Sequence, residues 1–289
     1  MPDVPAISIC IPAYNRARFL PALLDSIVAQ DFRDCEILIC EDRSPERAEI
    51  GEIARRYQAR RPGLIRYLEN DRNLGYDGNL RHMIEQAAGR YCLFMGNDDL
   101  LCPGALEAVR GAIGRHENVG VVVRSYASFA DAPENVIQEF KYFPDERFFP
   151  AGEQTIATVF RRSVVISGMV VHREAARAVA TDRFDGILLY QLYLVASICV
   201  TMNAVFLPQI LTLYRTGILP DFGSSDAERG KFVPREHTPE SSLHFMRGML
   251  DIARHVEETR GVRIYRPILR DIANYSYPVL AIQARKPVG

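Results

Sequence analysis

The chain has 289 residues, of which 48% are hydrophobic and 25% are charged. This composition is typical of a globular protein with a sizeable core, and it excludes wholesale disorder. The 35 Lys and Arg residues nearly balance the 36 Asp and Glu residues, so the formal net charge is -1. That balance argues against binding to nucleic acid, which usually requires a basic excess. The six cysteines include no CxxC pair, and we expect a reduced, cytoplasmic protein.

The first 125 residues alternate between short apolar runs and helical patterns. The apolar runs predict strands at 7–11, 36–40, 64–68, 91–95 and 119–123. Strands that are apolar throughout are buried on both faces, so this alternation predicts a mostly parallel sheet with helices on both sides. Ser44 is expected to cap the second helix, with Pro45 at its first position.

One stretch of the second half, residues 186–214, carries no charged side chain and is long enough to span a bilayer. Polar residues interrupt it, and it lacks the flanking basic clusters of a membrane span. We therefore expect a buried helix at 188–198 followed by a core strand at 204–214.

The rest of the second half is less regular. We expect a long loop at 130–152, a strand within 163–171, a short helix at 173–180, a mobile loop at 215–240, and helices at 241–260 and 264–282, the last broken near Pro278. His237 lies in the expected mobile loop, and its position alone suggests that it could close over a ligand.

Polar clusters follow three of the predicted strands, at 12–16, 41–44 and 97–99. In parallel sheets ligands bind at the carboxyl ends of the strands, so chemistry is expected there. The adjacent carboxylates of Asp98 and Asp99 repel each other unless a cation neutralises them, and oxygen ligands suit Mg²⁺ or Mn²⁺. The alternative is that both cap the helix that begins near Pro103.

Five motifs occur in order across residues 6–110. They read ICIPAYNR at 9–16, SIVAQ at 26–30, EILICEDRS at 36–44, NLG at 73–75 with AGRY at 88–91, and NDD at 97–99. Together they resemble the opening of a family 2 nucleotide-sugar glycosyltransferase of the bacterial surface-polysaccharide type. Residues 184–186 (FDG) and 213–215 (LYR) resemble the family more loosely.

The resemblance implies a GT-A fold, which is a Rossmann-like α/β architecture with a mostly parallel central sheet flanked by helices and, here, a helical C-terminal segment. Residues 1–125 would be the half that binds the nucleotide sugar, and residues 126–218 the half of the same domain that binds the acceptor. Residues 219–289 would form a mobile loop and the C-terminal helices.

The resemblance also implies a base pocket for the nucleotide, lined by Pro12, Tyr14, Arg16 and Asp42. A carboxylate at the end of the second strand, such as Asp42, can accept hydrogen bonds from a base or ribose edge. Without the resemblance, Asp42 would be interpreted as a turn-forming residue.

The sequence Asn97-Asp98-Asp99 takes the place of the family's DxD-type motif. By resemblance, Asn97 belongs to the donor site, Asp98 would bind the ribose or the sugar, and Asp99 would bind the Mn²⁺ or Mg²⁺ that bridges the diphosphate. Such a cation stabilises the charge that builds up on the leaving group.

One departure from the family concerns the catalytic base. Inverting members place an Asp at the start of the helix on the acceptor side, but Gln191 stands near that place. A glutamine cannot act as a general base at neutral pH. Asp185 is the nearest carboxylate that could substitute, and its alternative interpretation is a surface turn residue. His172 follows a predicted strand and is either a cleft residue or a structural histidine.

The leading hypothesis is transfer of a sugar, with inversion, from a nucleoside-diphosphate donor to a hydroxyl group of a saccharide acceptor. The acceptor could be lipid-linked at the inner face of the cell membrane, which the C-terminal helix at 265–285 could touch, although an ordinary packed helix is the alternative. The second hypothesis is a nucleotidyltransferase, but it would need a Gly-rich phosphate loop after the first strand, and residues 12–16 contain no glycine. The third hypothesis is an inactive nucleotide-sugar-binding protein, because Gln191 stands near the place where the catalytic Asp is expected.

Overall fold

The computed structural model describes residues 4–31, 33–218, 221, 224–229 and 239–283. The strands are β1 (Ile7–Ala13), β2 (Cys35–Glu41), β3 (Ile65–Glu69), β4 (Tyr91–Phe94), β5 (Leu100–Leu101), β6 (Val119–Phe129), β7 (Val136–Phe140), β8 (Arg147–Phe149), β9 (Val170–His172) and β10 (Asn203–Arg215). The α-helices are α1 (Leu20–Val28), α2 (Arg47–Arg60), α3 (Gly75–Gln86), α4 (Ala105–Arg115), α5 (Glu153–Val159), α6 (Arg173–Ala178), α7 (Tyr190–Ile198), α8 (Pro239–Arg260) and α9 (Tyr265–Gln283). Two short 3-10 helices are η1 (Ala17–Phe19) and η2 (Arg161–Ser163).

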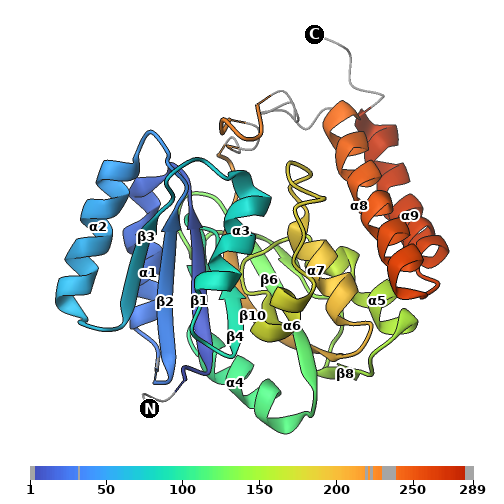
Figure 1. Cartoon of the computed structure of the whole chain (residues 1–289), viewed down its shortest axis with the longest axis horizontal. Coiled ribbons are helices and arrows are strands. Elements are labelled where there is room, and N and C mark those ends of the chain that lie inside the picture. The colour runs from blue at the N-terminus through green and yellow to red at the C-terminus, as the bar shows by residue number, and fades with distance from the viewer. Residues whose placement is uncertain (1–3, 32, 219–220, 222–223, 230–238, 284–289) are drawn as a thin grey trace.

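These strands belong to one sheet, in which eight follow the order β3-β2-β1-β4-β9-β6-β10-β5, while β7 pairs with β6 and β8 with β10 off this path. Figure 1 shows β1, β2 and β3 side by side, next to α1 and α2. β1 pairs in parallel with β2 and β4, β2 with β3, and β6 with β10. The short strand β9 runs antiparallel between β4 and β6 and joins the two parallel parts. The predicted α/β architecture with a mostly parallel sheet is therefore confirmed.

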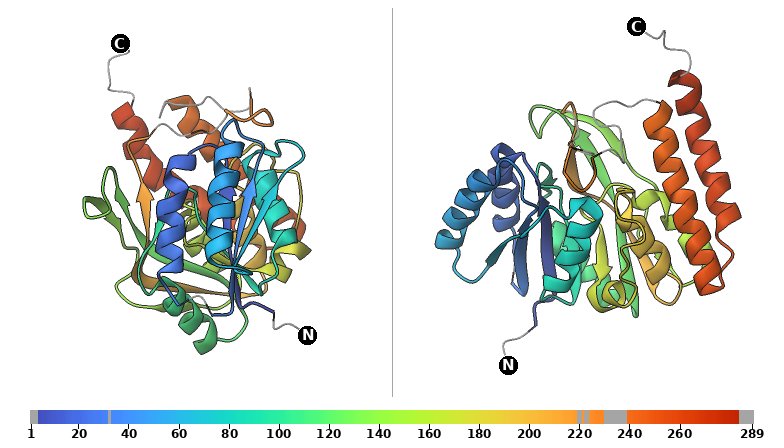
Figure 2. Two further views of the ribbon diagram at one scale, coloured as in Figure 1. Left: turned by 90° about the vertical axis from the view of Figure 1, so that its left-hand side faces the viewer. Right: turned by 45° about the horizontal axis from the view of Figure 1, so that its top comes forward.

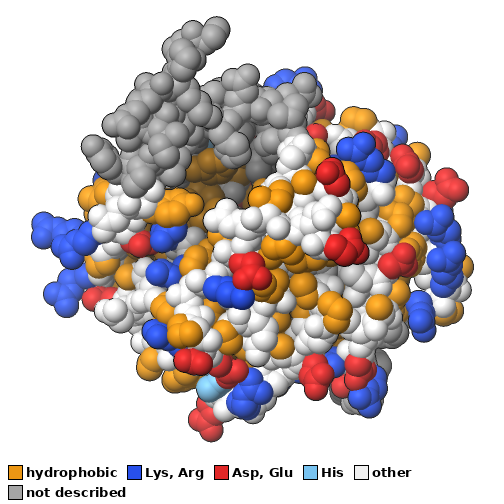
Figure 3. Space-filling view, turned by 180° about the vertical axis from the view of Figure 1, so that it is seen from behind, with side chains coloured by type: hydrophobic (Ala, Val, Ile, Leu, Met, Phe, Trp, Pro, Cys, Tyr) orange, Lys and Arg blue, Asp and Glu red, His pale blue; other side chains and the backbone are white. Residues whose placement is uncertain are grey.

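Two apolar layers cover the two faces of the sheet, because successive side chains of a strand point to opposite sides. Ile9 and Ile11 belong to the layer beneath α1, α2 and α4, whereas Cys10 belongs to the layer beneath α3 and α7. α8 and α9 lie side by side on the outer side of α7, far from α1 and α2 (Figures 1 and 2). On the face shown in Figure 3, basic and acidic side chains are interspersed, in line with the balanced charge.

The uncharged stretch at 186–214 folds as a buried helix and a core strand, which confirms that prediction. The nine residues of α7 are all buried, and β10 pairs with β6 and β5 within the sheet. Within the ranges that the structure describes, no helix combines the length and the apolar character needed to cross a bilayer.

Several local predictions were wrong. Helix α2 begins at Arg47 and not at Pro45, because the carboxylate of Glu41 accepts the backbone N–H groups of Arg43 and Ser44 and holds that turn itself. The expected loop at 130–152 contains β7 and β8, which find pairing partners in β6 and β10. Most of 163–171 is irregular, and only its end belongs to β9.

The end of the chain also differs from expectation. Helix α9 continues through Pro278 to Gln283 without the expected break. Much of the expected loop at 215–240, including His237, lies outside the described residues.

Candidate functional site

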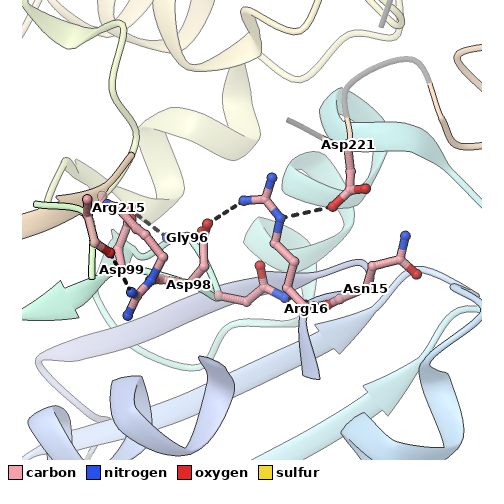
Figure 4. Close-up of polar contacts among 10 residues, drawn as sticks. Asn15, Arg16, Gly96, Asp98, Asp99, Arg215 and Asp221 are labelled. Atoms are coloured by element: carbon pink, nitrogen blue, oxygen red, sulfur yellow. Dashed lines mark hydrogen bonds and ion pairs between the residues drawn. The ribbon is translucent and has the colours of Figure 1, made fainter. Parts of the chain in front are cut away.

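The predicted polar clusters after β1 and β4 meet at the carboxyl ends of these neighbouring strands. The side-chain amide of Asn97 donates to the backbone oxygen of Asn15 at 2.8 Å. Asn15 and Arg16 both have positive φ angles, 54° and 62°, which turn the chain sharply after β1. This turn aims the guanidinium of Arg16 at the carboxylate of Asp98, with which it forms an ion pair (Figure 4).

The two adjacent aspartates point in different directions. Asp98 faces Arg16, whereas Asp99 is enclosed and accepts hydrogen bonds from the Ser167 hydroxyl and, at 2.8 Å, from the backbone N–H of Arg215. Burial and then the charge of Asp98 raise the pKa of Asp99 to about 7. Burial also raises the pKa of Asp98, although Arg16 opposes that effect. The positive charge near Asp98 and Asp99 is therefore too small to balance the two carboxylates.

Gly96 allows this close packing. A Cβ atom at position 96 would lie 3.0 Å from Oδ2 of Asp99 and 3.2 Å from Oγ of Ser167. The hydroxyl of Ser167 also accepts the backbone N–H of Gly96 at 2.8 Å. Sequence reasoning missed Ser167, which comes from the segment before β9 and carries no motif. Arg215 lies in the loosely matched LYR motif, to which we had assigned no role.

The cluster after β2 is built around Asp42, whose carboxylate accepts four hydrogen bonds. They come from the side-chain amides of Asn70 (2.7 Å) and Asn73 (2.9 Å) and from the backbone N–H groups of Leu74 and Gly75 (2.8 Å each). Asp42 thus ties the loop before α3 to the end of β2, whereas the local turn at 41–44 is held by Glu41. Burial raises the pKa of Asp42 to about 6. A contact of Asp42 with a nucleotide base stays a prediction.

Pro12 lies within β1, opposite Cys40 of β2, and not in the turn that follows the strand. Tyr14 lies in that turn and is partly buried. Burial, together with the charges of Asp226 and Asp221, raises the pKa of its phenol.

Described residues between 221 and 229 contact both the turn after β1 and the start of α3. Asp221 accepts a hydrogen bond from Nε of Arg16 at 2.9 Å (Figure 4). The backbone N–H of Ala227 donates to Asn73 at 2.9 Å, and Glu228 accepts the backbone N–H of Tyr76 at 2.7 Å. These contacts bring an acidic segment from late in the chain to the strand ends, which no sequence motif indicated.

In the second half of the chain, Asp185 forms a two-pronged ion pair with Arg81 of α3, at 2.6 and 2.8 Å. Gln191 is buried; its amide donates to the backbone oxygen of Val164 at 2.8 Å and accepts the hydroxyl of Tyr76 at 3.3 Å. Both predicted residues thus border α3, but neither contacts Asp98 or Asp99. A pocket of about 300 Å³ between α3 and residues 227–228 includes Asp185 in its wall.

Asp77 of α3 is a further buried carboxylate that sequence reasoning missed. It accepts the backbone N–H groups of Gly186 (2.9 Å), Leu188 (2.8 Å) and Tyr190 (2.9 Å), which precede or begin α7. Burial raises the pKa of Asp77 to about 6. Helical periodicity places Asp77 on α3 but gives no sign of these partners.

His172 has a structural role, which is the second of the two interpretations given to it. Its Nδ1 accepts the backbone N–H of Ala175 at the start of α6, and its ring packs edge-on against Tyr91 with centroids 5.2 Å apart.

The carboxylates of Asp98 and Asp99 fit a divalent cation, because burial and mutual repulsion disfavour two negative charges there. Over the described ranges, no group of three or more His, Cys, Asp or Glu side chains could hold a metal. A pair of carboxylates is nevertheless sufficient for Mg²⁺ that completes its shell with substrate phosphates and water.

Comparison with known proteins agrees with this geometry. Residues 8–170 match the family model described as glycosyl transferase family 2. A GalNAc(5)-diNAcBac-PP-undecaprenol beta-1,3-glucosyltransferase of Campylobacter jejuni is 29% identical over 106 residues, 37% of this chain and 34% of the relative. The putative glycosyltransferase EpsE of Bacillus subtilis is 29% identical over 118 residues, 41% of this chain and 42% of the relative. The chain thus spans less than half the length of these relatives.

Solved structures with low sequence identity share the fold. The TarS 1–349 structure from S. aureus superposes with a TM-score of 0.67 at 14% identity, covering 97% of this chain and 75% of that one. The mannosyltransferase PcManGT from Pyrobaculum calidifontis, solved with GDP-Man and Mn²⁺, gives a TM-score of 0.60 at 15% identity, covering all of this chain and 77% of that one. The expected GT-A fold is confirmed. Because the family model covers more than half of the sequence, this chain belongs to glycosyl transferase family 2.

Proposed function

We propose that this chain transfers a sugar from a nucleoside diphosphate to a hydroxyl group of a saccharide acceptor, with inversion and with the help of a divalent cation. The observation that carries the proposal is the convergence of Arg16, Asp98 and Asp99 at the carboxyl ends of β1 and β4. In doubly wound sheets this edge is where nucleotides bind. Solved neighbours support the donor class, since one TarS structure holds UDP-GlcNAc and PcManGT holds GDP-Man with Mn²⁺.

On this proposal the donor lies across the turn after β1, with Tyr14 beside its base. Arg16 now pairs with two carboxylates, Asp98 and Asp221. A diphosphate can replace them as the partner of the guanidinium, because arginine binds phosphate oxygens with charge-assisted hydrogen bonds. Asp99 would hold the cation, which would neutralise charge on the departing nucleoside diphosphate, and Asp98, once released by Arg16, would bind the ribose or the sugar.

The acceptor would bind beyond β4, on the side of β6 and α7. Position 191 is a glutamine and offers no carboxylate, and both oxygens of Asp185 accept hydrogen bonds from Arg81. Each oxygen keeps a free lone pair that could take a proton from the acceptor, but protonation would weaken the ion pair with Arg81. The role of Asp185 as the base stays a prediction.

Three finer points are also part of the proposal. A lipid-linked acceptor is suggested by the name of the Campylobacter relative, and a bacterial surface polysaccharide would be the product. With such an acceptor, the enzyme would transfer the sugar at the inner, cytoplasmic face of the membrane. Against membrane contact by α9, its residues Ile268 and Ile272 are buried in the core beside α8.

A non-catalytic nucleotide-sugar-binding protein is the second candidate, and the buried, fully engaged amide of Gln191 favours it. A turnover assay with a panel of nucleoside-diphosphate sugars distinguishes the two. Release of nucleoside diphosphate that depends on a saccharide acceptor supports transfer, whereas donor binding without turnover supports the binding protein.

The donor site is tested by titrating UDP and GDP into the protein calorimetrically, with and without Mn²⁺. We expect at least one of them to bind more tightly with Mn²⁺, and Asp99→Ala to lose that gain while keeping its fold. Asp145→Asn is the matched control, because Asp145 is an exposed carboxylate between β7 and β8. Unchanged Mn²⁺ dependence in Asp99→Ala would refute the metal assignment.

A further inference from the structure

A fully buried arginine lies next to the candidate site, on the acceptor half of the sheet. Nη2 of Arg124, in β6, donates to the backbone oxygens of Val165 (3.0 Å) and Ser167. Its Nε and Nη1 atoms are buried and have no hydrogen-bond partner. Among the described residues, no carboxylate forms an ion pair or hydrogen bond with it. Burying a guanidinium without a counter-charge is costly, so this position calls for an explanation.

A second arginine with a smaller deficit lies on the same group of aromatic rings: Nη1 of Arg162, in η2, donates to the backbone oxygen of Thr158, and only its buried Nε lacks a partner. The guanidinium of Arg162 lies 5.5 Å from the ring centre of Tyr142. The guanidinium of Arg124 lies 4.9 Å from the ring centre of Tyr126, and the two tyrosine rings are 6.5 Å apart. Burial lowers the pKa of both arginines. Two cations therefore flank one pair of tyrosine rings.

The neighbouring Arg161 has a hydrogen-bonded carboxylate partner, which Arg124 and Arg162 lack within the described part of the chain. Its Nε donates to Asp271 at 2.7 Å, and its guanidinium lies 4.2 Å from the ring centre of Tyr275. The cluster reaches the surface here, since Val164 is 36% exposed and Tyr275 is 56% exposed. Arg162 and Tyr142 are themselves half-buried, so part of each side chain is open to solvent, whereas Arg124 is fully buried.

The cluster is connected to both parts of the candidate site. Ser167, whose backbone oxygen accepts Arg124, donates its hydroxyl to Asp99. The backbone oxygen of Val164, two residues after Arg162, accepts the amide of Gln191. The two arginines therefore lie against the segment that separates the donor motif from α7.

We propose that Arg162 and Tyr142, with Arg124 behind them, form an acceptor subsite for a saccharide that carries an oxyanion, either a phosphate or a carboxylate. An oxyanion would accept N–H groups of Arg162, because guanidinium groups pair with such oxygens through charge-assisted hydrogen bonds. Its negative charge would also offset the buried positive charge of Arg124, which lies behind the tyrosine rings. Tyr142 offers a ring face with a polar tip, which suits the mixed apolar and polar surface of a sugar. The term acceptor rests on the proposed function, whereas the oxyanion site does not.

The test measures thermal stabilisation of the full chain by inorganic phosphate, against chloride at matched ionic strength, because a ligand of the native state raises its melting temperature. We expect Arg162→Gln to weaken the apparent phosphate affinity roughly tenfold or more, the effect of losing one charge-assisted hydrogen bond. Arg162 is partly exposed, so this variant should fold. Arg124→Met, which fills the buried volume, should weaken it similarly. Arg263→Gln is the control, since its side chain is 91% exposed.

Phosphate could also bind at the donor site, and Arg16→Gln separates the two sites. We expect Arg16→Gln to keep the thermal stabilisation by phosphate that Arg162→Gln loses. The proposal would be overturned if Arg16→Gln lost this stabilisation and Arg162→Gln kept it, or if wild type and Arg162→Gln were stabilised equally. Glucose 6-phosphate and glucuronate distinguish the two oxyanions, and glucose is their uncharged match. Glucose that stabilises the chain as well as both charged sugars would also overturn it. A chain that binds phosphate through Arg162 but binds no nucleoside diphosphate would refute the proposed function and leave this site standing.

Discussion

Replacing Asp77 with alanine tests how the start of α7 is held in place. Three backbone N–H groups, those of Gly186, Leu188 and Tyr190, share this one carboxylate at 2.8 to 2.9 Å. Leu188 also has a positive φ of 65°, an unfavourable conformation for a leucine. Without the carboxylate, the loop that leads into α7 loses three hydrogen bonds to α3 and keeps the ion pair of Asp185 with Arg81.

The expected cost follows from these contacts. A buried donor left without a partner costs about 1–3 kcal/mol, so three such donors would cost several kcal/mol together. The raised pKa of Asp77 shows that burying the charge is itself unfavourable, and alanine removes that penalty. We therefore expect Asp77→Ala to lower the free energy of unfolding by about 3 kcal/mol, near the lower limit of the sum. This loss is a large share of a typical free energy of unfolding of about 5–15 kcal/mol.

Urea unfolding at pH 7, followed by circular dichroism, measures this loss. Asp77→Asn should fall in between, because its carboxamide keeps one acceptor oxygen. Asp185→Ala is the control on the same loop; its ion pair with Arg81 is partly exposed and should contribute less than about 1 kcal/mol. A loss below about 1 kcal/mol in Asp77→Ala, or one equal to that of the control, would refute the reasoning.

Three other expectations concern Asp42, Asp77 and Asp185. Asp42→Ala should weaken nucleoside-diphosphate binding even without metal, because its contacts shape the loop beside the base pocket; a calorimetric loss seen only with Mn²⁺ would contradict this. In Asp185→Asn, loss of a general base would slow transfer about 10²–10⁴-fold. We expect a loss in this range at saturating donor with donor affinity retained, and a loss below about tenfold would remove Asp185 from the mechanism. Asp42 and Asp77 have folded-state pKa values of about 6, above the value in the unfolded chain. The folded chain therefore binds protons more tightly than the unfolded chain. As the pH rises from about 4 to 7, these two groups lower the free energy of unfolding. Asp77→Asn should show a smaller decline in urea unfolding over that range, and identical pH profiles would contradict the assignment.

The sequence predicted the elements of the first half well, because continuous apolar runs and helical periodicity are local signals. It also placed the polar clusters at 12–16 and 97–99 after strands, at the edge where ligands bind, but it did not predict the ion pair of Arg16 with Asp98. Pairing of β7 and β8 could not be predicted in this way: their exposed residues lack a clear apolar pattern, and their strand character depends on β6 and β10.

The partners of the site carboxylates were harder to foresee. Asp42 and Asp77 bind mainly backbone N–H groups, and a backbone donor leaves no trace in residue type. Asp221 and Ser167 reach the site from distant parts of the chain, with Asp221 located 205 residues after its partner Arg16. Such contacts follow from tertiary packing and not from local spacing.

The hydrogen bond from Arg215 to Asp99 has a consequence for hybrids of related enzymes. The family match ends at residue 170, yet the backbone N–H that holds Asp99 belongs to the end of β10. A hybrid that joins the first 170 residues to the second half of a relative would therefore place its DxD-type carboxylate in a foreign electrostatic setting. The metal preference of such a hybrid should follow the second half as well as the first, although the motif itself comes entirely from the first.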